Sequence, residues 1–300
     1  MSAIRTVVVG GGIMGGGIAV ALARAGHAVA VVEPDATAAA ALTSRVQELA
    51  GDAPEGTPRV VSGWEPVMTA HFVIEAAPED LALKEDVWAR LGALAPLDAL
   101  LASNTSSLDI DALAALVPRP ERVLATHWFN PAYEVECVEV APGRATDPDV
   151  VGRALTILRD AGKHAVVVRN GAGFVANRIQ FAAIREALLC LEEGMPAESI
   201  DEVVSTSFAP RLAALGPLAN ADLGGLDTYL AIFEVLRSAH GDRFAPPRIL
   251  ADLVADGRHG VKTGAGVFDY TPAAARALVE RRDERLSRII AATRDRGGTA

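Results

Sequence analysis

Short apolar runs alternate with longer alanine-rich segments over the first 170 residues of the chain. Runs of this length and composition are typical of buried strands, and the intervening segments are typical of helices. Strands that alternate with helices predict a mainly parallel, doubly wound α/β sheet. The expected strands are Arg5–Val9, Ala28–Val32, Arg59–Ser62, Phe72–Glu75, Ala99–Ala102, Val123–His127 and Ala165–Val168.

The pattern changes to helical spacing after Asn170. Apolar residues recur every three or four positions from Phe174 to Glu193, and Gly194 follows as a stop signal. Thr271 and Pro272 have the residue types of an N-cap and a first helical turn. We therefore predict an all-helical domain over residues 171–300, with a boundary at the Gly-rich turn near residue 170. Further helices are expected at Ala197–Phe208, Asp227–His240 and Pro247–Asp256.

A glycine-rich segment, Gly10-Gly11-Gly12-Ile13-Met14-Gly15, lies between the first strand and the first helix. Strand, G-x-G-x-x-G and helix in this order form the dinucleotide-binding fingerprint of a Rossmann-type domain, predicted here over residues 1–170. Gly10 makes the tight turn, Gly12 lets the backbone approach the pyrophosphate, and Gly15 permits close packing of helix on strand. Ile13 and Met14 open the helix whose N-terminus faces the anion. A chain with 27 glycines can contain the motif by chance, so the order of elements carries the assignment.

Glu33 ends the second predicted strand, about twenty residues after the glycines, where the fingerprint places an acidic residue. A carboxylate there accepts hydrogen bonds from the ribose hydroxyls and repels a 2′-phosphate. No Arg or Lys occurs between Glu33 and Arg45 to bind such a phosphate. We therefore predict NAD rather than NADP as the cofactor, the alternative being a solvated glutamate at a strand end.

Composition restricts the class of protein. Half of the 300 residues are hydrophobic, which indicates a globular protein of one large or two ordinary domains. The net charge of −10 argues against nucleic acid as a partner. Cys137 and Cys190 lie in apolar stretches without metal-ligand spacing, so we expect buried free thiols in a reducing compartment and no metal site. The absence of a signal peptide or a transmembrane run predicts a cytoplasmic protein without a membrane partner.

His127 and Glu139 are the strongest candidates for chemistry. His127 ends a predicted strand, and ligands bind outside the carboxyl ends of the strands in an open α/β sheet. Pro131 breaks that strand, and the loose alternation of Tyr133–Ala141 can bring Glu139 back toward His127. An imidazole paired with a carboxylate has a fixed tautomer and a stabilised charged form, as a general base requires.

The motifs around these residues resemble those of the L-3-hydroxyacyl-CoA dehydrogenase family. The resemblance extends from Gly10 to Tyr270, although Ala172 replaces the proline usual in the family. It is carried by Ser103-Asn104-Thr105-Ser106, His127-Trp128-Phe129-Asn130-Pro131, Glu139, Ala172-Gly173-Phe174-Val175-Ala176-Asn177-Arg178, Leu215-Gly216-Pro217, Asp222-Leu223-Gly224-Gly225-Leu226-Asp227 and Gly260–Gly266 before Phe268 and Tyr270.

The resemblance implies catalytic roles for four residues. His127 would take the proton from a β-hydroxyl while hydride passes to NAD, and Glu139 would hold the imidazole. Ser106 and Asn177 would form hydrogen bonds with the reacting oxygen. Alternative interpretations are a helix cap for Ser106 and an ordinary helix amide for Asn177.

The resemblance also places residues near the nicotinamide ribose. These are Glu79, Lys84, Ser106 and Asn130. Alternatively, Glu79 and Lys84 are ordinary charges of a first helical turn, and Asn130 only turns the chain. The other histidines have no acidic partner at a useful spacing and are expected to be structural: His27, His71, His164, His240 and His259.

One departure from the family pattern concerns the binding of the substrate. The acyl-CoA enzymes have a helical hairpin that helps to hold the coenzyme A, but the equivalent span, Asp35–His71, is compressed here. Arg45 is the one cation in Asp35–Glu55, a poor surface for three phosphates. Asn130-Pro131-Ala132-Tyr133 and the helix at Gly173–Gly194 also resemble gulonate and carnitine dehydrogenases, which oxidise small hydroxy acids without coenzyme A.

Three functions therefore stay open. The preferred one is an NAD-dependent dehydrogenase of a 3-hydroxyacyl thioester, carried on coenzyme A or a carrier protein. The second is a dehydrogenase of a free hydroxy acid, and the third is an NAD-binding structural protein that has lost turnover. We also expect a homodimer, because Phe174–Leu191 and Leu226–Leu236 are apolar on more than one face.

Overall fold

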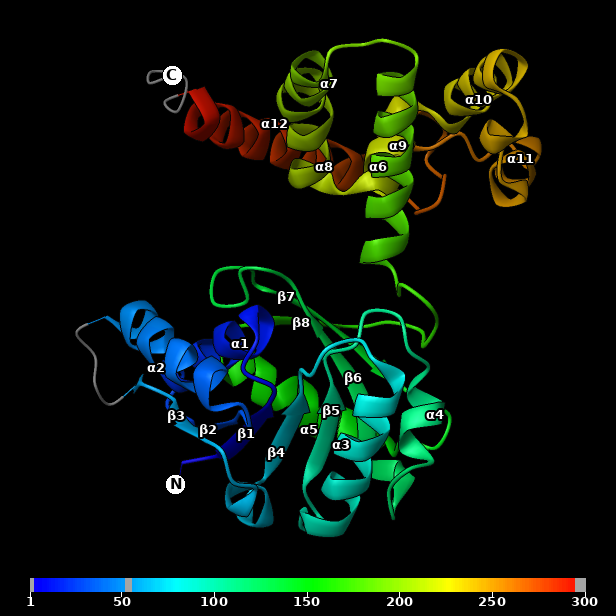
Figure 1. Cartoon of the computed structure of the whole chain (residues 1–300). Helices are drawn as coiled ribbons and strands as arrows, with labels where there is room; N and C mark the ends of the chain where they lie inside the picture. Colours follow the sequence, from blue (N-terminus) through cyan, green and yellow to red (C-terminus); the bar gives the residue numbers. More distant parts are fainter. Residues whose placement is uncertain (1–2, 52–55, 295–300) are drawn as a thin grey trace. The chain divides into compact units, whose positions relative to one another are not determined.

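An eight-stranded sheet organises the N-terminal part of the chain (Figure 1). The computed structural model describes residues 3–51 and 56–294. The strand order is β3-β2-β1-β4-β5-β6-β7-β8. Neighbouring strands pair in parallel except β6 and β7, which pair antiparallel, so the predicted mainly parallel sheet is confirmed. The strands are β1 Arg5–Val9, β2 Ala28–Val32, β3 Arg59–Val61, β4 Phe72–Glu75, β5 Leu100–Ser103, β6 Val123–Trp128, β7 Cys137–Pro142 and β8 His164–Val167.

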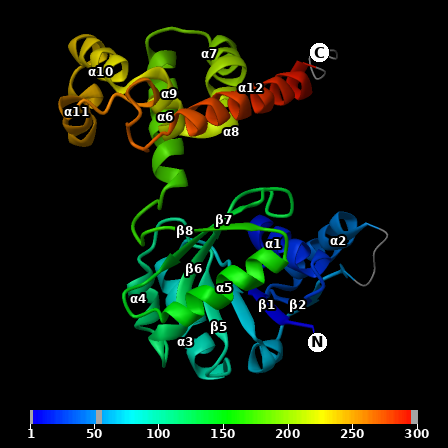
Figure 2. The ribbon, with the colours of Figure 1, turned by 180° about the vertical axis from the view of Figure 1, so that it is seen from behind.

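Both faces of the sheet are covered by helices, as Figures 1 and 2 show from opposite sides. Successive strand residues face opposite ways, so Val8 packs against one helical layer and Val7 and Val9 against the other. Burial on both faces explains why the strands are continuously apolar in sequence. The layer on the side of Val8 consists of α1 Ile13–Arg24, α2 Ala36–Ala50 and α5 Pro148–Asp160, and the opposite layer of α3 Leu81–Leu94 and α4 Ile110–Ala114.

Aspartate side chains start four of these helices. Asp35, Asp80, Asp109 and Asp147 accept hydrogen bonds from backbone amides of the first turns of α2, α3, α4 and α5. A carboxylate at this position satisfies an amide that has no partner inside the helix and interacts favourably with the helix dipole. The boundaries of the α/β layers are therefore encoded locally.

The predicted ends of β1, β2 and β4 are confirmed, and β3 is one residue shorter than predicted. β5, β6 and β8 are each displaced or lengthened by one residue relative to the prediction. β7 begins at Cys137, four residues after the alternation begins at Tyr133, because residues 131–135 form turns in which Glu134 N and Val135 N bond to Pro131 O. Strand ends depend on such long-range and turn contacts more than on composition.

Helices make up the C-terminal part, as predicted. The expected helix at Ala197–Phe208 is longer than predicted, because α7 continues through a π-helical turn, Val204–Phe208, into α8. Thr271 Oγ1 accepts a hydrogen bond from Ala274 N and so acts as the predicted N-cap. Among the residues that the structure describes, no helix is long and apolar enough to cross a membrane. The helices are α6 Ala176–Glu192, α7 Ala197–Val203, α8 Ala209–Leu215, α9 Pro217–Gly224, α10 Leu226–His240, α11 Arg248–Ala255 and α12 Pro272–Arg294.

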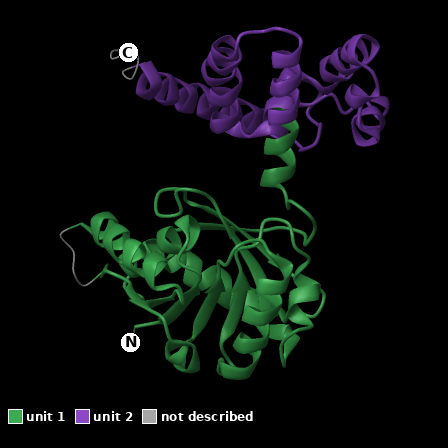
Figure 3. Ribbon diagram, in the orientation of Figure 1, with its two compact units in different colours: residues 1–183 green, residues 184–300 purple. Residues whose placement is uncertain are grey.

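Two compact units, residues 1–183 and 184–300, divide the chain within α6 (Figure 3). The predicted boundary near residue 170 lies in the turn that precedes this helix. The difference arises because the N-terminus of α6 is bound to the sheet: Val175 N and Ala176 N both donate to Glu139 in β7. The first turns of α6 therefore belong to the same compact unit as the sheet.

Asp222 in α9 fixes the C-terminal turn within the second unit. The buried carboxylate accepts hydrogen bonds from Val267 N, Phe268 N and the Tyr270 hydroxyl, each at 2.9 Å. A Cβ on Gly266 would overlap the Asp222 carboxylate, so the turn requires glycine there. Burial and the neighbouring Asp222 raise the pKa of Tyr270 above its ordinary value, which keeps the phenol protonated as a donor. The residue types at Asp222, Gly266 and Tyr270 are thus explained by the way they hold this turn within the second unit.

Two histidines differ from their prediction. His240 Nδ1 lies 3.9 Å from Glu193 Oε1, and His259 Nδ1 lies 3.8 Å from Asp227 Oδ2. The expectation that these histidines lack acidic partners was therefore wrong. The partners lie on other elements of the helical unit, which linear spacing could not reveal.

Candidate active site

His127 and Glu139 face each other across the antiparallel strands β6 and β7. They are directly paired in the register, and His127 Nδ1 lies 2.8 Å from Glu139 Oε2. The two residues are only 6% and 3% exposed. Directly opposite residues of an antiparallel pair project to the same face, so the sheet itself brings the imidazole and the carboxylate together.

The second carboxylate oxygen of Glu139 is held by the N-terminus of α6. Glu139 Oε1 accepts hydrogen bonds from Val175 N at 3.1 Å and Ala176 N at 2.9 Å. A carboxylate is favoured at a helix N-terminus because it satisfies unpaired amides and meets the positive end of the dipole. Sequence reasoning missed these two donors, although they lie within the Gly173–Arg178 motif.

The imidazole of His127 is enclosed by aromatic rings. Its centroid lies 4.7 Å from that of Phe129 and 5.5 Å from that of Phe174. Phe174 has a φ of +44°, unusual for a residue with a side chain, and its ring is buried. When Nδ1–H donates to Glu139, Nε2 keeps its lone pair, so the geometry leaves one nitrogen of a fixed ring to accept a proton.

Ser106 lies in the loop that follows β5. Its amide donates to Glu79 Oε1 at 3.3 Å, whereas its hydroxyl has no hydrogen-bond partner among the residues that the structure describes. Asp109, not Ser106, caps α4, so the alternative interpretation of Ser106 as a helix cap was wrong. In the same loop, Asn104 Oδ1 accepts a hydrogen bond from Trp128 N at 2.9 Å, which ties the loop to the residue after His127.

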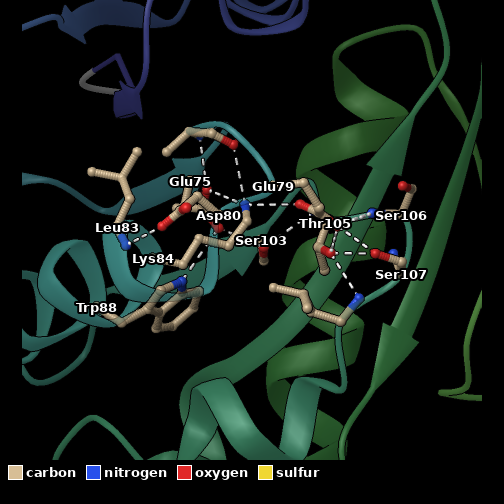
Figure 4. A network of polar contacts seen from close by, with 12 residues as sticks. Glu75, Glu79, Asp80, Leu83, Lys84, Trp88, Ser103, Thr105, Ser106 and Ser107 are labelled. Atoms are coloured by element: carbon tan, nitrogen blue, oxygen red, sulfur yellow. Dashed lines mark hydrogen bonds and ion pairs between the residues drawn. The ribbon is translucent and has the colours of Figure 1, made fainter.

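Lys84 and Glu79 belong to a network of polar contacts at the ends of β4 and β5 (Figure 4). The Lys84 ammonium is 2.7 Å from Glu75 Oε1 and 3.2 Å from Glu79 Oε2, and its side chain is 1% exposed. The interpretation of Lys84 as an ordinary charge of a helical turn was therefore wrong. Sequence reasoning assigned no role to Glu75, although a carboxylate that ends an apolar strand was a visible signal.

The carboxylate of Glu79 is favoured in its ionised form. Burial opposes ionisation, but hydrogen bonds from the hydroxyls of Thr105 and Ser107 and the charge of Lys84 together lower the pKa of Glu79 below its ordinary value. The ionised carboxylate of Glu79 thus contacts Lys84 in α3 and the hydroxyls of Thr105 and Ser107 in the loop of Ser106.

Asn130 and Asn177 lie at two different positions in the first unit. Asn130 is exposed, directly after Phe129, and its peptide bond to Pro131 is cis. Asn177 is half-buried in the first turn of α6, next to the amide that Glu139 binds. Within residues 3–51 and 56–294, neither side-chain amide forms a hydrogen bond, so both remain available to a ligand.

The glycine-rich loop has the shape that a dinucleotide requires. Gly10 has a φ of +106°, and a Cβ there would lie 2.7 Å from Ala76 O. A Cβ on Gly15 would overlap the carbonyl oxygen of Gly10, whereas one on Gly12 would meet open space. Gly12 starts α1 without a side-chain cap, so the amides at Ile13 and Met14 face outward to an anion. The loop therefore fits the pyrophosphate of NAD.

Glu33 and Arg45 bind opposite groups of this loop. Glu33 Oε2 accepts from Gly11 N at 2.8 Å, whereas the Arg45 guanidinium donates to Gly11 O at 3.1 Å and Gly12 O at 2.7 Å. The position of Arg45 was not foreseen, because its spacing from the glycines gives no signal. Its charge is used to hold the loop.

Comparison with known proteins agrees with this geometry. Residues 5–171 match the NAD-binding domain of 3-hydroxyacyl-CoA dehydrogenase, and residues 173–270 match the C-terminal domain of the same enzyme. The chain belongs to the 3-hydroxyacyl-CoA dehydrogenase family. It is an NAD-dependent oxidoreductase of the 3-hydroxyacyl-CoA dehydrogenase type, as the sequence motifs predicted.

Relatives in this family differ in substrate. The chain is 37% identical over 281 residues to a probable 3-hydroxybutyryl-CoA dehydrogenase of Bacillus subtilis, covering 89% of this chain and 97% of the relative. It is 33% identical to a 5-formyl-3-hydroxy-2-methylpyridine 4-carboxylate 5-dehydrogenase of Mesorhizobium japonicum, covering 97% and 98%. A crystal structure of a 3-hydroxyacyl-CoA dehydrogenase from Archaeoglobus fulgidus has a TM-score of 0.79 at 32% identity and covers 95% of this chain and 99% of its own.

Removal of the Glu33 carboxylate should weaken the preference for NAD. We expect Glu33→Ala to lower kcat/KM for NAD by about 10- to 100-fold, the range for a lost hydrogen bond to a charged group. The value for NADP should fall less or rise, because the charge that repels the 2′-phosphate is gone. Steady-state kinetics with both cofactors checks this, with Glu48→Ala, an exposed acid of α2, as the charge control. An unchanged ratio of the two values would contradict the assignment.

Proposed function

We propose that this enzyme oxidises a 3-hydroxy group to a 3-oxo group with His127 as the general base. The observation that carries the proposal is the buried pair of His127 Nδ1 and Glu139 Oε2 at 2.8 Å. The pair fixes the ring and leaves Nε2 to accept a proton. Glu139 stabilises the imidazolium that forms, and the amides of α6 keep the carboxylate in place.

The roles of Ser106 and Asn177 follow from their side-chain polar groups, which have no hydrogen-bond partner among the described residues. Ser106 and Asn177 offer a hydroxyl and an amide to the substrate oxygen as its proton passes to His127. Gly10, Gly12, Ile13, Met14, Gly15 and Glu33 would hold the pyrophosphate and adenosine ribose of NAD, and Glu79, Lys84, Ser106 and Asn130 would lie near the nicotinamide ribose. NAD, when bound, supplies the hydride acceptor.

We propose two alternatives for the group that is attached to the 3-hydroxyacyl part of the substrate. A 3-hydroxyacyl thioester is the first choice, because the family and the Bacillus relative are named for such substrates. A free hydroxy acid is the second choice, because only eight residues of sequence, 51–58, separate α2 from β3, and Arg45 is engaged by the glycine loop. The relative from Mesorhizobium is named for a pyridine carboxylate, so this family includes such chemistry.

A substrate panel separates these versions. We expect NADH absorbance to appear with NAD and a short (S)-3-hydroxyacyl-CoA, and the carrier-protein and free-acid forms of the same acyl group serve as matched alternatives. Turnover of the free acids alone would remove the thioester version. Binding of NAD without turnover of any substrate would favour the third possibility, a retired structural protein.

Replacement of the base should stop chemistry without loss of cofactor binding. We expect His127→Gln to lower kcat by about 10²- to 10⁴-fold, the contribution of a positioned general base, with little change in the Kd for NAD. Stopped-flow or steady-state NADH absorbance measures the first quantity and calorimetry the second. His27→Gln is the matched control, because His27 is a buried histidine that contacts Thr6 away from the pair. Full turnover by His127→Gln would refute the assignment.

We further propose that the helical unit forms a homodimer. Exposed apolar side chains lie along α6 and α10, including Leu188, Leu191, Ile232 and Val235. An apolar cavity of about 390 Å³ opens among α9, α10 and α11 and is lined by residues such as Leu218, Phe233 and Ile249. Apolar surface of this kind marks an interaction site in a soluble chain.

Sedimentation velocity at micromolar concentration tests the dimer. We expect the mass of two chains, and a variant with charges on α10, Ile232→Glu and Val235→Glu, should sediment as one chain because burial of a charge in an apolar interface is costly. A monomer for the unmodified chain would overturn this proposal.

A cytoplasmic location is also proposed, on the basis of the cysteines. Cys137 and Cys190 are free and half-buried rather than fully buried as expected. Burial and the nearby Glu139 raise the pKa of Cys137, which keeps this thiol protonated and unreactive. Free thiols are usual in a reducing compartment.

A further inference from the structure

Glu75 is a fully buried carboxylate at the carboxyl end of β4, between β1 and β5. Four donors surround it: Lys84 Nζ at 2.7 Å, Ser103 Oγ at 2.6 Å, Ala77 N at 2.8 Å and Trp88 Nε1 at 3.3 Å. A buried charge of this kind is tolerated only when such partners satisfy it. Apolar residues would fill this part of the core without the desolvation cost of a buried carboxylate. A role other than packing therefore has to account for Glu75.

Two routes connect Glu75 with Thr105, the residue before Ser106 (Figure 4). In the first, Lys84 bridges Glu75 and Glu79, and Glu79 accepts the Thr105 hydroxyl. In the second, Ser103 Oγ donates to Glu75 and accepts the Thr105 amide at 3.1 Å. The hydroxyl and the amide of Thr105 are therefore both linked to Glu75. The hydroxyl is linked through Glu79 and Lys84, and the amide through Ser103.

Thr105 in turn fixes the backbone that carries Ser106. Thr105 Oγ1 accepts the amides of Ser107 at 3.2 Å and Leu108 at 2.9 Å, and Glu79 Oε1 accepts the amide of Ser106 at 3.3 Å. Four successive amides, those of residues 105–108, thus donate to side-chain acceptors. Against this fixed backbone, the Ser106 hydroxyl is left without a partner among the described residues.

We propose that Glu75 is a positioning residue that holds the 105–108 backbone so that the Ser106 hydroxyl stays aimed at the reacting oxygen. The proposal rests on the function proposed above for Ser106. Lys84 acts here as the bridge between Glu75 and Glu79, because its ammonium is fully enclosed by them and by Ala77 O. Glu75 touches neither substrate nor cofactor in this scheme.

Amide hydrogen exchange tests the backbone part without any substrate. Glu75→Gln alone leaves the Lys84 charge less compensated and can unfold the chain, so the main variant is Glu75→Gln with Lys84→Met, which removes both charges at similar volume. We expect peptides that cover residues 105–108 to exchange about 10- to 100-fold faster than in the unmodified protein, because hydrogen bonds to or through charged groups are lost. Val31→Ala, which truncates a fully buried core residue of β2, is the control for general destabilisation.

Kinetics tests the link to Ser106. At saturating NAD, so that weaker cofactor binding through the loss of Lys84 does not contribute, we expect the double variant to lower kcat at least about tenfold with a smaller change in the KM of the substrate, because a mispositioned hydroxyl loses its contact chiefly in the transition state. Adding Ser106→Ala to the double variant should then lower kcat little further, since residues that act through one another are not additive.

Two results would overturn the positioning role: unchanged exchange at 105–108 in the folded double variant, or full additivity of its effect with that of Ser106→Ala. If the unmodified protein turns over no hydroxy substrate, the proposed function fails, yet the exchange data still decide whether Glu75 holds this backbone. The two failures are therefore distinguishable.

Discussion

The antiparallel pairing of β6 with β7 is the constraint on which the candidate site depends. A parallel β7 would need a long crossover and would not place Glu139 opposite His127. The reversal lets one register bring both side chains to the same face of the sheet, 2.8 Å apart. Glu139 also accepts hydrogen bonds from the amides at the N-terminus of α6, so the same pairing fixes where the helix begins. The proposed base His127, its carboxylate partner and the N-terminus of α6 are thus positioned by one strand pair.

Two buried carboxylates in the first unit, Glu75 and Glu139, have partners that differ in what they leave free. The carboxylate of Glu75 is surrounded by fixed donors, and the Lys84 ammonium that it binds is fully enclosed. The polar groups of this pair are engaged by protein partners, which suits the pair to holding structure. In the other pair, Glu139 is also fully satisfied, but His127 keeps one nitrogen outside the pair. Rigidity is therefore common to both pairs, and the second pair also leaves a nitrogen for the proposed proton transfer.

Much of this could be predicted from the sequence, because local rules encode it. Strands buried on both faces must be apolar along their whole length, so the alternation with helices was visible, and the glycine loop has a spacing set by the shape of a dinucleotide. The His127–Glu139 pair could be predicted because Pro131 breaks the strand after His127 and an alternating segment returns Glu139 only twelve residues later. The contacts of Glu75 with Ser103 and of Arg45 with Gly12 could not be predicted, because 28 and 33 residues separate the partners and their proximity depends on the order of the strands. The division within α6 also depends on a long-range contact, that of Glu139 with the helix N-terminus.

The chemistry and the substrate handle are encoded by different kinds of elements. His127 is the penultimate residue of β6, the Ser106 loop follows β5, and Glu139 lies within β7, where neighbouring strands and buried charges leave little room for change. The span between β2 and β4, by contrast, includes the capped helix α2, the short edge strand β3 and the 3-10 helix Glu65–Thr69. Because β3 lies at the edge of the sheet, changes in this span disturb the central strands least. The proposed proton acceptor, His127, can therefore stay in place while the part of the substrate that carries the hydroxyl changes. Such a separation agrees with the names of two relatives of this chain, one for a coenzyme A thioester and the other for a pyridine carboxylate.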